Sequence, residues 1–407
     1  MSSIRAQFPF FTHNPDIVYL DNAATTQKPQ VVLDVMRDFY ERDNVSIAGL
    51  YGASMRMSAA VEAERAFLKS FLGGGEGSHL IFTQSATDSL NILASGLEKM
   101  MRGPDSIVVT DIEHHANILP WRRLAQRTGA KMQSVPLTAD FNLDYDQLYD
   151  MAKTAKIVAL THVSNITGLR LDIGTIARQI RVVNPKCIII VDGSQGVTKE
   201  PVDGASWGID AYVFSAHKIY GPLGIGVLWG TAKLLEMVEP YRVGGKMVDS
   251  VTSSKVQWAP LPAKLEAGTP NVAGILGMSA GVRFQQQMWA LGSAKYEQEL
   301  TAYCLEKLHK IKEVKIIGTP GNIHGIISFV VENIDSYDIG SFLGKNPLDM
   351  TAPSIAVRVG THCGQPFMQA AGVDGTIRVS FAPYNTLEDI DSFVTVLGAA
   401  ITYFSHD

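Results

Sequence analysis

A lysine and an aspartate stand at the ends of two apolar stretches of the chain. Asp192 directly follows the run 187–191, and Lys218 comes shortly after the run 211–214. Short runs of branched and aromatic residues predict buried strands, so both charges would lie close to the core. A single lysine is most often a surface residue in a turn, but an amine and a carboxylate at neighbouring strand ends suit the cofactor pyridoxal phosphate (PLP). The amine would form a Schiff base with the aldehyde of PLP, and the carboxylate would pair with its pyridinium nitrogen.

One of the three cysteines differs from the others in its surroundings. Most cysteines are buried and inert, as we expect for Cys187 in an apolar run and for Cys304 on a helical stretch. Cys363 instead follows His362 in a polar, glycine-flanked loop downstream of Arg358. Such a setting favours an exposed sulfur and a stabilised thiolate. We therefore expect Cys363 to be a nucleophile and the other two cysteines to be structural.

A candidate anion site lies earlier in the chain. Ser85, Ala86 and Thr87 follow an apolar run and open a helical stretch. Backbone N–H groups and the helix dipole at such a position attract anions, including phosphate. An ordinary helix cap is the simpler explanation of the same pattern.

Other polar side chains also follow apolar runs. His114 comes after the run 106–110, Asn165 after the run 157–160, and Gln195 shortly after Asp192. A lone histidine in such a place is usually a loop residue, and the amides commonly satisfy loop backbone groups. In a PLP site, the same two amides would bond the ring hydroxyl and tune the Schiff base.

The apolar runs are the elements that must position these residues. They alternate with helical stretches between residues 79 and 228, which predicts a mostly parallel, doubly wound α/β sheet with ligands at the carboxyl ends of its strands. At 407 residues the chain is longer than one hydrophobic core usually organises, so we expect two domains. We place a large PLP-binding domain at 19–275. A smaller α+β domain, carrying the Cys363 loop, would comprise 1–18 and 276–407.

Local patterns give further boundaries. We expect a loop over 42–57, a helix over 58–72 and another helix over 272–290. A strand is expected over 355–358, and Thr386 with the acids after it resembles the capping box of a final helix.

Composition excludes several functional classes. The net charge is −5 without a long run of either sign, so neither nucleic acid nor an anionic membrane is an expected partner. The odd, sparse cysteine count argues against disulfides and for a reducing compartment. The first residues lack the apolar core of a signal peptide, and no apolar run could span a bilayer. We expect a cytoplasmic protein with no metal site.

Two segments resemble those of a known family. The sequences VDGSQG (191–196) and FSAHKIYGP (214–222) resemble the cofactor segments of the class V aminotransferases, and more narrowly those of group II cysteine desulfurases of the SufS/CsdA type. The similarity runs from residue 19 to residue 386, with several motifs in the family order. It implies a PLP-dependent transferase of fold type I, the aspartate aminotransferase-like fold.

The resemblance also implies an activity. L-cysteine would be converted to alanine, with a persulfide on Cys363 that passes to an acceptor protein for iron–sulfur cluster assembly or a related pathway. Selenocysteine and cysteine sulfinate are plausible further substrates.

The resemblance assigns roles to individual residues of a homodimer. Thr269 would reach the PLP phosphate of the partner subunit. The catalytic residues would be Lys218, Cys363 and His114, with His114 stacked on the PLP ring. Further contacts with PLP would come from Ala86, Thr87, Asn165, Asp192, Gln195, Ser215 and His217. The substrate would be bound by Arg378, which grips its carboxylate, and by Arg358 and Asn165.

The chain departs from the family at one place. Around Val45 the family usually shows a His-Arg pair near the partner's active site, whereas residues 44–50 contain no such pair, and we expect the loop to be one residue longer. The departure bears on substrate handling or persulfide protection, and not on the PLP residues.

Two alternatives stay open. The first is another PLP enzyme on the same fold, such as an aminotransferase, an epimerase or a kynureninase-like hydrolase; a nucleophilic Cys363 counts against it, because those reactions need no thiol. The second is an inactive sulfur-relay scaffold, which the missing His-Arg pair would fit.

Overall fold

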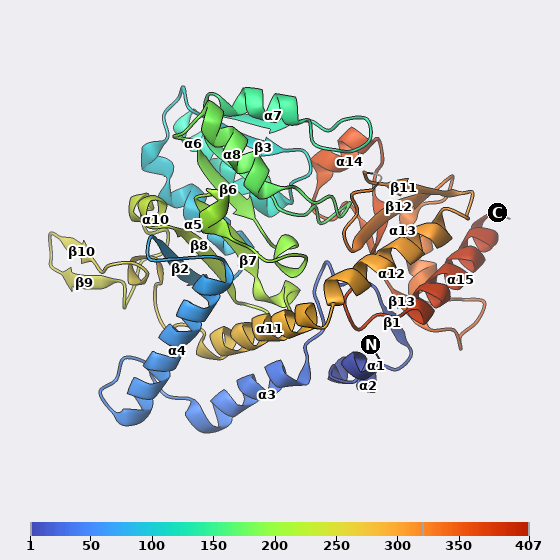
Figure 1. Cartoon of the computed structure of the whole chain (residues 1–407), viewed down its shortest axis with the longest axis horizontal. Coiled ribbons are helices and arrows are strands. Elements are labelled where there is room, and N and C mark those ends of the chain that lie inside the picture. The colour runs from blue at the N-terminus through green and yellow to red at the C-terminus, as the bar shows by residue number, and fades with distance from the viewer. Residues whose placement is uncertain (1, 320, 406–407) are drawn as a thin grey trace.

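A seven-stranded mixed sheet forms the centre of the larger part of the molecule (Figure 1). The computed structural model describes residues 2–319 and 321–405. Residues 1, 320, 406 and 407, which belong to the smaller predicted domain, lie outside the described residues. The strand order is β2-β8-β7-β6-β5-β3-β4, and β8 alone runs antiparallel to its neighbours within this sheet. The strands are β2 (Ser78–Thr83), β3 (Ser106–Thr110), β4 (Lys131–Val135), β5 (Ala155–Thr161), β6 (Ile188–Asp192), β7 (Ala211–Ser215) and β8 (Gly226–Thr231).

Helices cover both faces of this sheet. Along β6, Ile189 and Val191 belong to one buried cluster while Ile188 and Ile190 belong to the other. A sheet buried on both sides has continuous apolar strands, which is why the runs in the sequence show no polar alternation. One face is covered by α4 (Gly52–Phe71), α7 (Tyr145–Ala152), α8 (Ile173–Val183), α9 (Gly204–Trp207) and α11 (Val272–Ala290), and the other by α5 (Ala86–Gly96), α6 (Leu119–Thr128) and α10 (Ala232–Met237).

A smaller antiparallel sheet forms the second part of the structure. Its strand order is β11-β12-β15-β14, and its buried side packs on helices α12, α13 and α15. These elements confirm the predicted α/β fold with an α+β unit. Their bounds are β11 (Val314–Ile317), β12 (Ile326–Val331), β14 (Arg358–Gly360), β15 (Thr376–Ser380), α12 (Ser293–Leu308), α13 (Ser336–Gly344), α14 (Gln365–Ala371) and α15 (Leu387–Phe404).

Two local predictions were wrong in their bounds, and one strand was missed. The expected loop over 42–57 ends where α4 begins at Gly52, because helix-forming residues follow the glycines that suggested a loop. The strand expected over 355–358 is divided between β13 (Ser354–Ala356), which pairs with β1 (Ile17–Tyr19), and β14, which pairs with β15. The sequence analysis also missed β4, an edge strand whose partly exposed side chains lack a buried strand's pattern.

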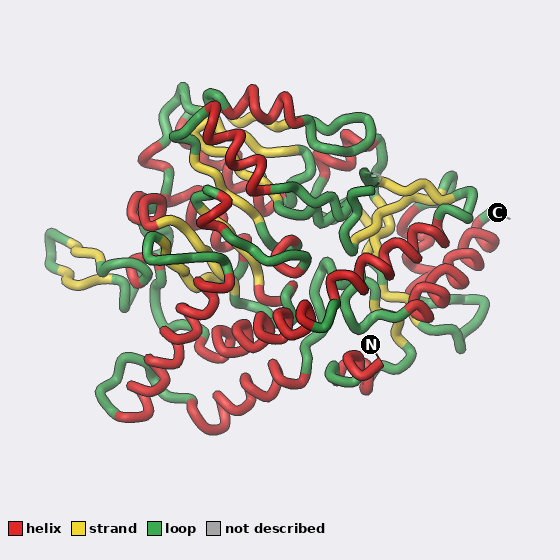
Figure 2. The backbone as a smooth tube through the Cα atoms, in the orientation of Figure 1, coloured by secondary structure: helices red, strands yellow, loops and turns green. Residues whose placement is uncertain are grey.

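Other helices and a hairpin lie outside the two sheets. The helix predicted over 272–290 is confirmed as α11. Figure 2 shows β9 (Val248–Val251) and β10 (Val256–Trp258) as a hairpin that stands away from the large sheet. The N-terminal helices are α1 (Ser2–Arg5), α2 (Pro9–His13) and α3 (Gln30–Asp38). Within the described residues, no helix combines the length and the apolar character needed to cross a membrane.

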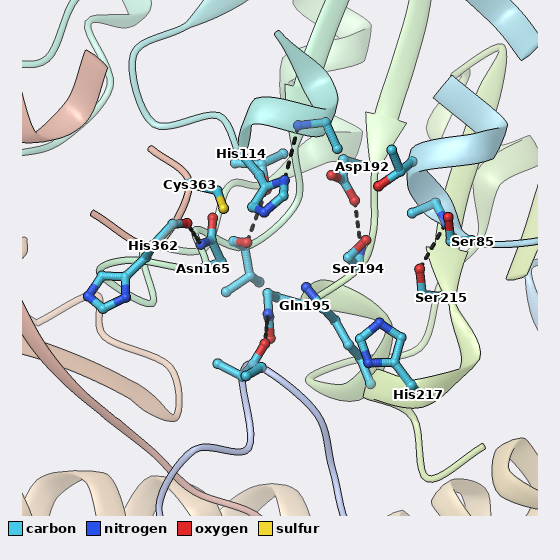
Figure 3. Close-up of a pocket in the computed structure, with 18 of the residues that line it drawn as sticks. Ser85, His114, Asn165, Asp192, Ser194, Gln195, Ser215, His217, His362 and Cys363 are labelled. Carbon is cyan, nitrogen blue, oxygen red and sulfur yellow. Dashed lines mark hydrogen bonds between the residues drawn. The ribbon is translucent and has the colours of Figure 1, made fainter. Parts of the chain in front are cut away.

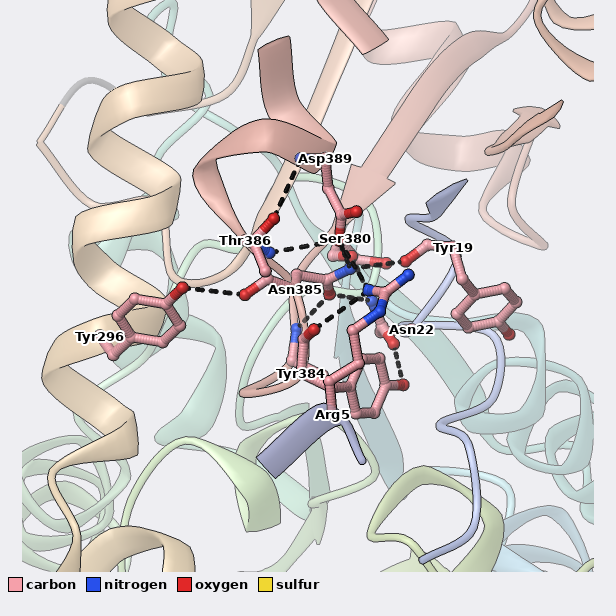
Figure 4. Close-up of polar contacts among 10 residues, drawn as sticks. Arg5, Tyr19, Asn22, Tyr296, Ser380, Tyr384, Asn385, Thr386 and Asp389 are labelled. Atoms are coloured by element: carbon pink, nitrogen blue, oxygen red, sulfur yellow. Dashed lines mark hydrogen bonds and ion pairs between the residues drawn. The ribbon is translucent and has the colours of Figure 1, made fainter. Parts of the chain in front are cut away.

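Buried polar contacts tie the N-terminal segment to the start of α15 (Figure 4). Thr386 and Asp389 form the predicted capping box, since each side chain pairs with the other residue's backbone N–H. The side-chain oxygen of Asn385 accepts hydrogen bonds from Asn22 Nδ2 (3.0 Å) and from the backbone N–H of Ala382 (2.9 Å). Its Nδ2 donates to the carbonyl of Tyr19 (2.8 Å) and to Asp389 Oδ2 (3.1 Å). Asn385 thereby places the segment that leads to the site.

We expect Asn385→Ala to destabilise the protein by about 3 kcal/mol, since it leaves several buried groups without a partner. For a chain of this size, the midpoint of thermal unfolding would fall by about 3 °C. The control is Asn44→Ala, because Asn44 is exposed and makes no side-chain hydrogen bond in the described part of the chain. Equal midpoints for the two variants would contradict the structural role given to Asn385.

Candidate active site

A cavity of about 270 Å³ opens where β5, β6 and β7 end (Figure 3). The start of α5 closes one end of the cavity, and the loop that carries Cys363 borders the opposite end. The cavity brings together side chains that are far apart in the sequence. The predicted site residues that line it are Ala86, Thr87, His114, Asn165, Asp192, Gln195, Ser215, His217, Lys218, Arg358, Cys363 and Arg378.

Lys218 ends the short turn that follows β7, and Asp192 is the last residue of the adjacent strand β6. Burial lowers the pKa of Lys218 to about 8; the Asp192 carboxylate opposes this effect, and Arg378 adds to it. The Asp192 side chain is buried, and its Oδ1 accepts a hydrogen bond from the backbone N–H of Ser194 at 2.9 Å. The cavity therefore combines an amine that readily loses its proton with a fixed carboxylate.

The start of α5 forms a polar end of the cavity. Ser85 caps the helix by accepting a hydrogen bond from the N–H of Asp88, and the N–H of Ala86 donates to Ser215 Oγ at 2.8 Å. His217 Nδ1 is buried and has no hydrogen-bond partner among the described residues. Burial lowers the pKa of His217 to about 4, so the ring is neutral. A helix start beside an unpartnered ring nitrogen can receive an anion such as phosphate.

His114 is both a loop cap and a cavity residue. Its Nδ1 accepts a hydrogen bond from the backbone N–H of Ala116 at 3.0 Å. Burial, and then the charge of Lys218, lower the pKa of His114 to about 4. The neutral ring therefore carries its proton on Nε2. In Figure 3 this ring lies between Cys363 and Asp192.

The two predicted amides each use one hydrogen bond to fix their position. Asn165 Nδ2 donates to the carbonyl of His362 at 2.9 Å, and Gln195 Nε2 donates to the carbonyl of Ala23 at 2.7 Å. An amide NH₂ has a second hydrogen to donate. Both side chains can therefore still bind a polar group in the cavity.

The Cys363 loop has an unusual backbone. His362 and Cys363 adopt φ values of 51° and 57°, in the left-handed region that side chains other than glycine seldom adopt. The carbonyl of Cys363 accepts a hydrogen bond from the N–H of His115 at 2.8 Å. The Cys363 residue is exposed, whereas Cys187 and Cys304 are buried, as predicted. Burial raises the pKa of the Cys187 thiol to about 12 and also raises the pKa of the Cys304 thiol, which leaves Cys363 as the reactive candidate.

Two arginines face each other across adjacent strands at the part of the cavity that the small sheet borders. Arg358 on β14 pairs in register with Arg378 on β15. The guanidinium of Arg378 is buried, donating from Nη1 to the carbonyl of Asn165 (2.8 Å) and from Nη2 to Asp21 Oδ1 (3.1 Å). Its Nε has no partner among the described residues. Like charges opposite each other are unfavourable, so this end is prepared for an anion such as a carboxylate.

Asp21, the ion-pair partner of Arg378, is a residue that the sequence analysis missed. Burial raises the pKa of its carboxyl, while Arg378 opposes that rise. The only signal in the sequence is an acid directly after the apolar pair Tyr19-Leu20. Its partner, Arg378, lies at the other end of the chain, so no local pattern could reveal the pair.

Thr269 does not line this cavity. It is exposed and borders a second cavity of about 660 Å³, together with Gln84 and Arg242. Its predicted contact with the phosphate of a partner subunit stays a prediction.

The family profile described as "Aminotransferase class-V" matches residues 18–393. The chain belongs to the class V aminotransferase family. Members of this family depend on PLP. A "Probable cysteine desulfurase" from Vibrio cholerae is 35% identical over 410 residues, covering 98% of each chain.

Two solved structures of cysteine desulfurases are similar throughout their length. CsdA (S-sulfonic acid) from Escherichia coli has a TM-score of 0.86 and 34% identity, and 98% of each chain is covered. The apo enzyme from Thermococcus onnurineus NA1 has a TM-score of 0.91 and 30% identity, with the same coverage. Within the class V aminotransferases, the resemblance to cysteine desulfurases is thus confirmed at the level of the whole fold.

The buried side chain of His362 makes the free energy of unfolding depend on pH. Burial, and then Arg378, lower its pKa to about 3 in the folded protein, against about 6.5 when unfolded. Between these values the unfolded chain holds the extra proton, so stability falls as the pH falls. From pH 7.5 to pH 5.5 this residue alone would remove about 1.4 kcal/mol of stability.

Urea unfolding across this pH range tests the expectation. Between pH 7.5 and pH 5.5, His362→Gln should lose about 1.4 kcal/mol less stability than the wild type. His13→Gln, at an exposed histidine, should follow the wild type. Parallel pH profiles for His362→Gln and the wild type would show that the ring of His362 contributes nothing to the acid sensitivity.

Proposed function

We propose that the protein is a PLP-dependent cysteine desulfurase that converts L-cysteine to L-alanine and holds the removed sulfur as a persulfide on Cys363. The observation that carries the proposal is that an exposed cysteine borders the same cavity as Lys218 and Asp192. A PLP aminotransferase or epimerase needs no thiol at that place. The names of the relatives agree with this choice.

The residues around the cavity fit PLP. Lys218 can hold the aldehyde carbon, Asp192 can hold a proton on the ring nitrogen, and the start of α5 with His217 Nδ1 can receive the phosphate. His114 would lie against the ring face. When bound, PLP supplies an aldehyde for the substrate amine and a ring that accepts electrons from the substrate carbon.

The chain's own residues would prepare the substrate. Arg378 and Arg358 bind the carboxylate of cysteine, with Arg378 held by Asp21 and by the carbonyl of Asn165. Lys218 Nζ then takes the α-proton as a general base, and its pKa of about 8 places that transfer near neutral pH.

Cys363 would carry out the sulfur transfer. Its thiolate attacks the sulfur of the substrate, so an S–S bond forms and the substrate's C–S bond breaks. The electron pair of the broken bond stays with carbon, and the substrate's thiol proton balances the new C–H bond of alanine. The enzyme retains the second sulfur as a Cys363 persulfide, which passes to a thiol of an acceptor protein for iron–sulfur cluster assembly or a related pathway.

A homodimer would complete the site. In this proposal Thr269 of each subunit contacts the phosphate bound by the other, which accounts for its position outside the cavity of its own chain. The loop at residues 44–50, without the family's His-Arg pair, would then approach the partner's site. The proposed binding of the substrate carboxylate does not depend on that loop, because Arg358 and Arg378 come from the same chain as Lys218.

The direct test is to incubate the purified protein with L-cysteine and dithiothreitol and to measure alanine and sulfide together. The proposal requires equal amounts of the two products. 3-Mercaptopyruvate without sulfide would indicate transamination, and no turnover in a PLP-loaded protein would favour the inactive scaffold.

Cys363→Ala should separate the substrates. Cysteine has a poor leaving group and needs a thiolate to accept its sulfur, so turnover should fall at least about 100-fold. Selenocysteine and cysteine sulfinate release their leaving groups more easily, so their turnover should fall less than about tenfold.

Cys304→Ala is the matched control, because that sulfur is buried in α12 and does not line the cavity. It should retain turnover of cysteine. If Cys363→Ala released sulfide from cysteine at the wild-type rate, the persulfide step would be refuted.

A further inference from the structure

The backbone that carries Asp192 and Gln195 lies directly on two aromatic rings. A Cβ atom added to Gly193 would stand 1.9 Å from Tyr212 Cζ, and one added to Gly196 would stand 2.0 Å from His162 Nδ1. Both glycines are required for this close approach rather than for an unusual φ. The segment 193–196 therefore takes its position from His162 and Tyr212.

These rings belong to a buried polar network. His162 Nδ1 lies 2.9 Å from the hydroxyl of Tyr212, and His162 Nε2 lies 2.7 Å from Glu200 Oε1. Because a carboxylate only accepts hydrogen bonds, Nε2 carries a proton. Arg170 completes the network by donating from Nη1 to both Glu200 oxygens, at 3.0 and 2.9 Å.

The same histidine also holds the strand end. The backbone N–H of His162 donates to the carbonyl of Asp192 at 2.9 Å, where β5 and β6 finish side by side. His162 and Tyr212 are fully buried, and neither lines the cavity. His162 and Tyr212 can therefore affect the cavity only through the segment 193–196, which they support.

We propose that His162 is a positioning residue which, with Tyr212 and Glu200, sets the Asp192 carboxylate against the cofactor's ring nitrogen. The ring of His162 fixes the position of Gly196. The hydroxyl of Tyr212 fixes the orientation of the His162 ring, and Glu200 fixes the tautomer of His162. We expect substrate binding to change little, since Arg378 is held by Asp21 as well as by the carbonyl of Asn165, and not by a hydrogen bond to His162. The inference rests on the proposed cofactor and not on cysteine as the substrate.

The test uses His162→Leu and Tyr212→Phe in the full-length protein. PLP affinity is measured by titrating each apoprotein with PLP, and kcat and KM for cysteine are measured on the loaded proteins. We expect His162→Leu to weaken PLP binding about tenfold and to lower kcat with KM within twofold of the wild type. Tyr212→Phe, which removes one hydroxyl, should weaken PLP binding about threefold.

Two further variants separate positioning from simple stability. His162→Gln keeps an N–H for Glu200 and should recover part of the PLP affinity. Leu397→Ala, in the core of α15, should lower the melting temperature without changing PLP affinity. If His162→Leu lowered the melting temperature but left PLP affinity unchanged, or raised KM with kcat intact, the proposal would be overturned. Failure of the cysteine assay with normal PLP binding would refute the proposed function instead.

Discussion

The burial of one amine opposite one carboxylate is the constraint on which the rest of the structure depends. An ammonium group loses much of its hydration in the cavity, and burial accordingly lowers the pKa of Lys218 to about 8. Asp192 limits that cost because β6 and β7 end side by side. The sheet is buried on both faces, with α5 and α11 on opposite sides, so both groups lie at the end of a buried core.

The small sheet contributes the other half of the site. β14 and β15 bring Arg358 and Arg378 opposite each other, and the loop after β14 holds Cys363. Hydrogen bonds from Arg378 to the carbonyl of Asn165, and from Asn165 to the carbonyl of His362, join this loop to the end of β5. These contacts therefore hold the Cys363 loop of the small sheet against the carboxyl end of the large sheet.

Much of this arrangement could be predicted because strand ends are local features. The apolar runs before Asp192 and Lys218 are visible in the sequence, and a parallel sheet brings such ends together. The glycine-flanked surroundings of Cys363 likewise distinguished it from Cys187, which is buried.

The remainder depends on contacts between distant segments. Asp21 reaches Arg378 from the opposite end of the chain, and His162 gains its importance from Tyr212 and Glu200. An edge strand such as β4 has too few buried side chains to produce a pattern. Residues of these kinds become visible only when the packing of the whole chain is known.

The central claim is that Lys218 carries the cofactor opposite Asp192. Borohydride reduction of the protein as purified, followed by digestion and peptide mass spectrometry, tests it most directly. The account predicts a pyridoxyl group on the peptide that contains Lys218. A modification on another lysine such as Lys28, or none in a protein that had bound PLP, would contradict it.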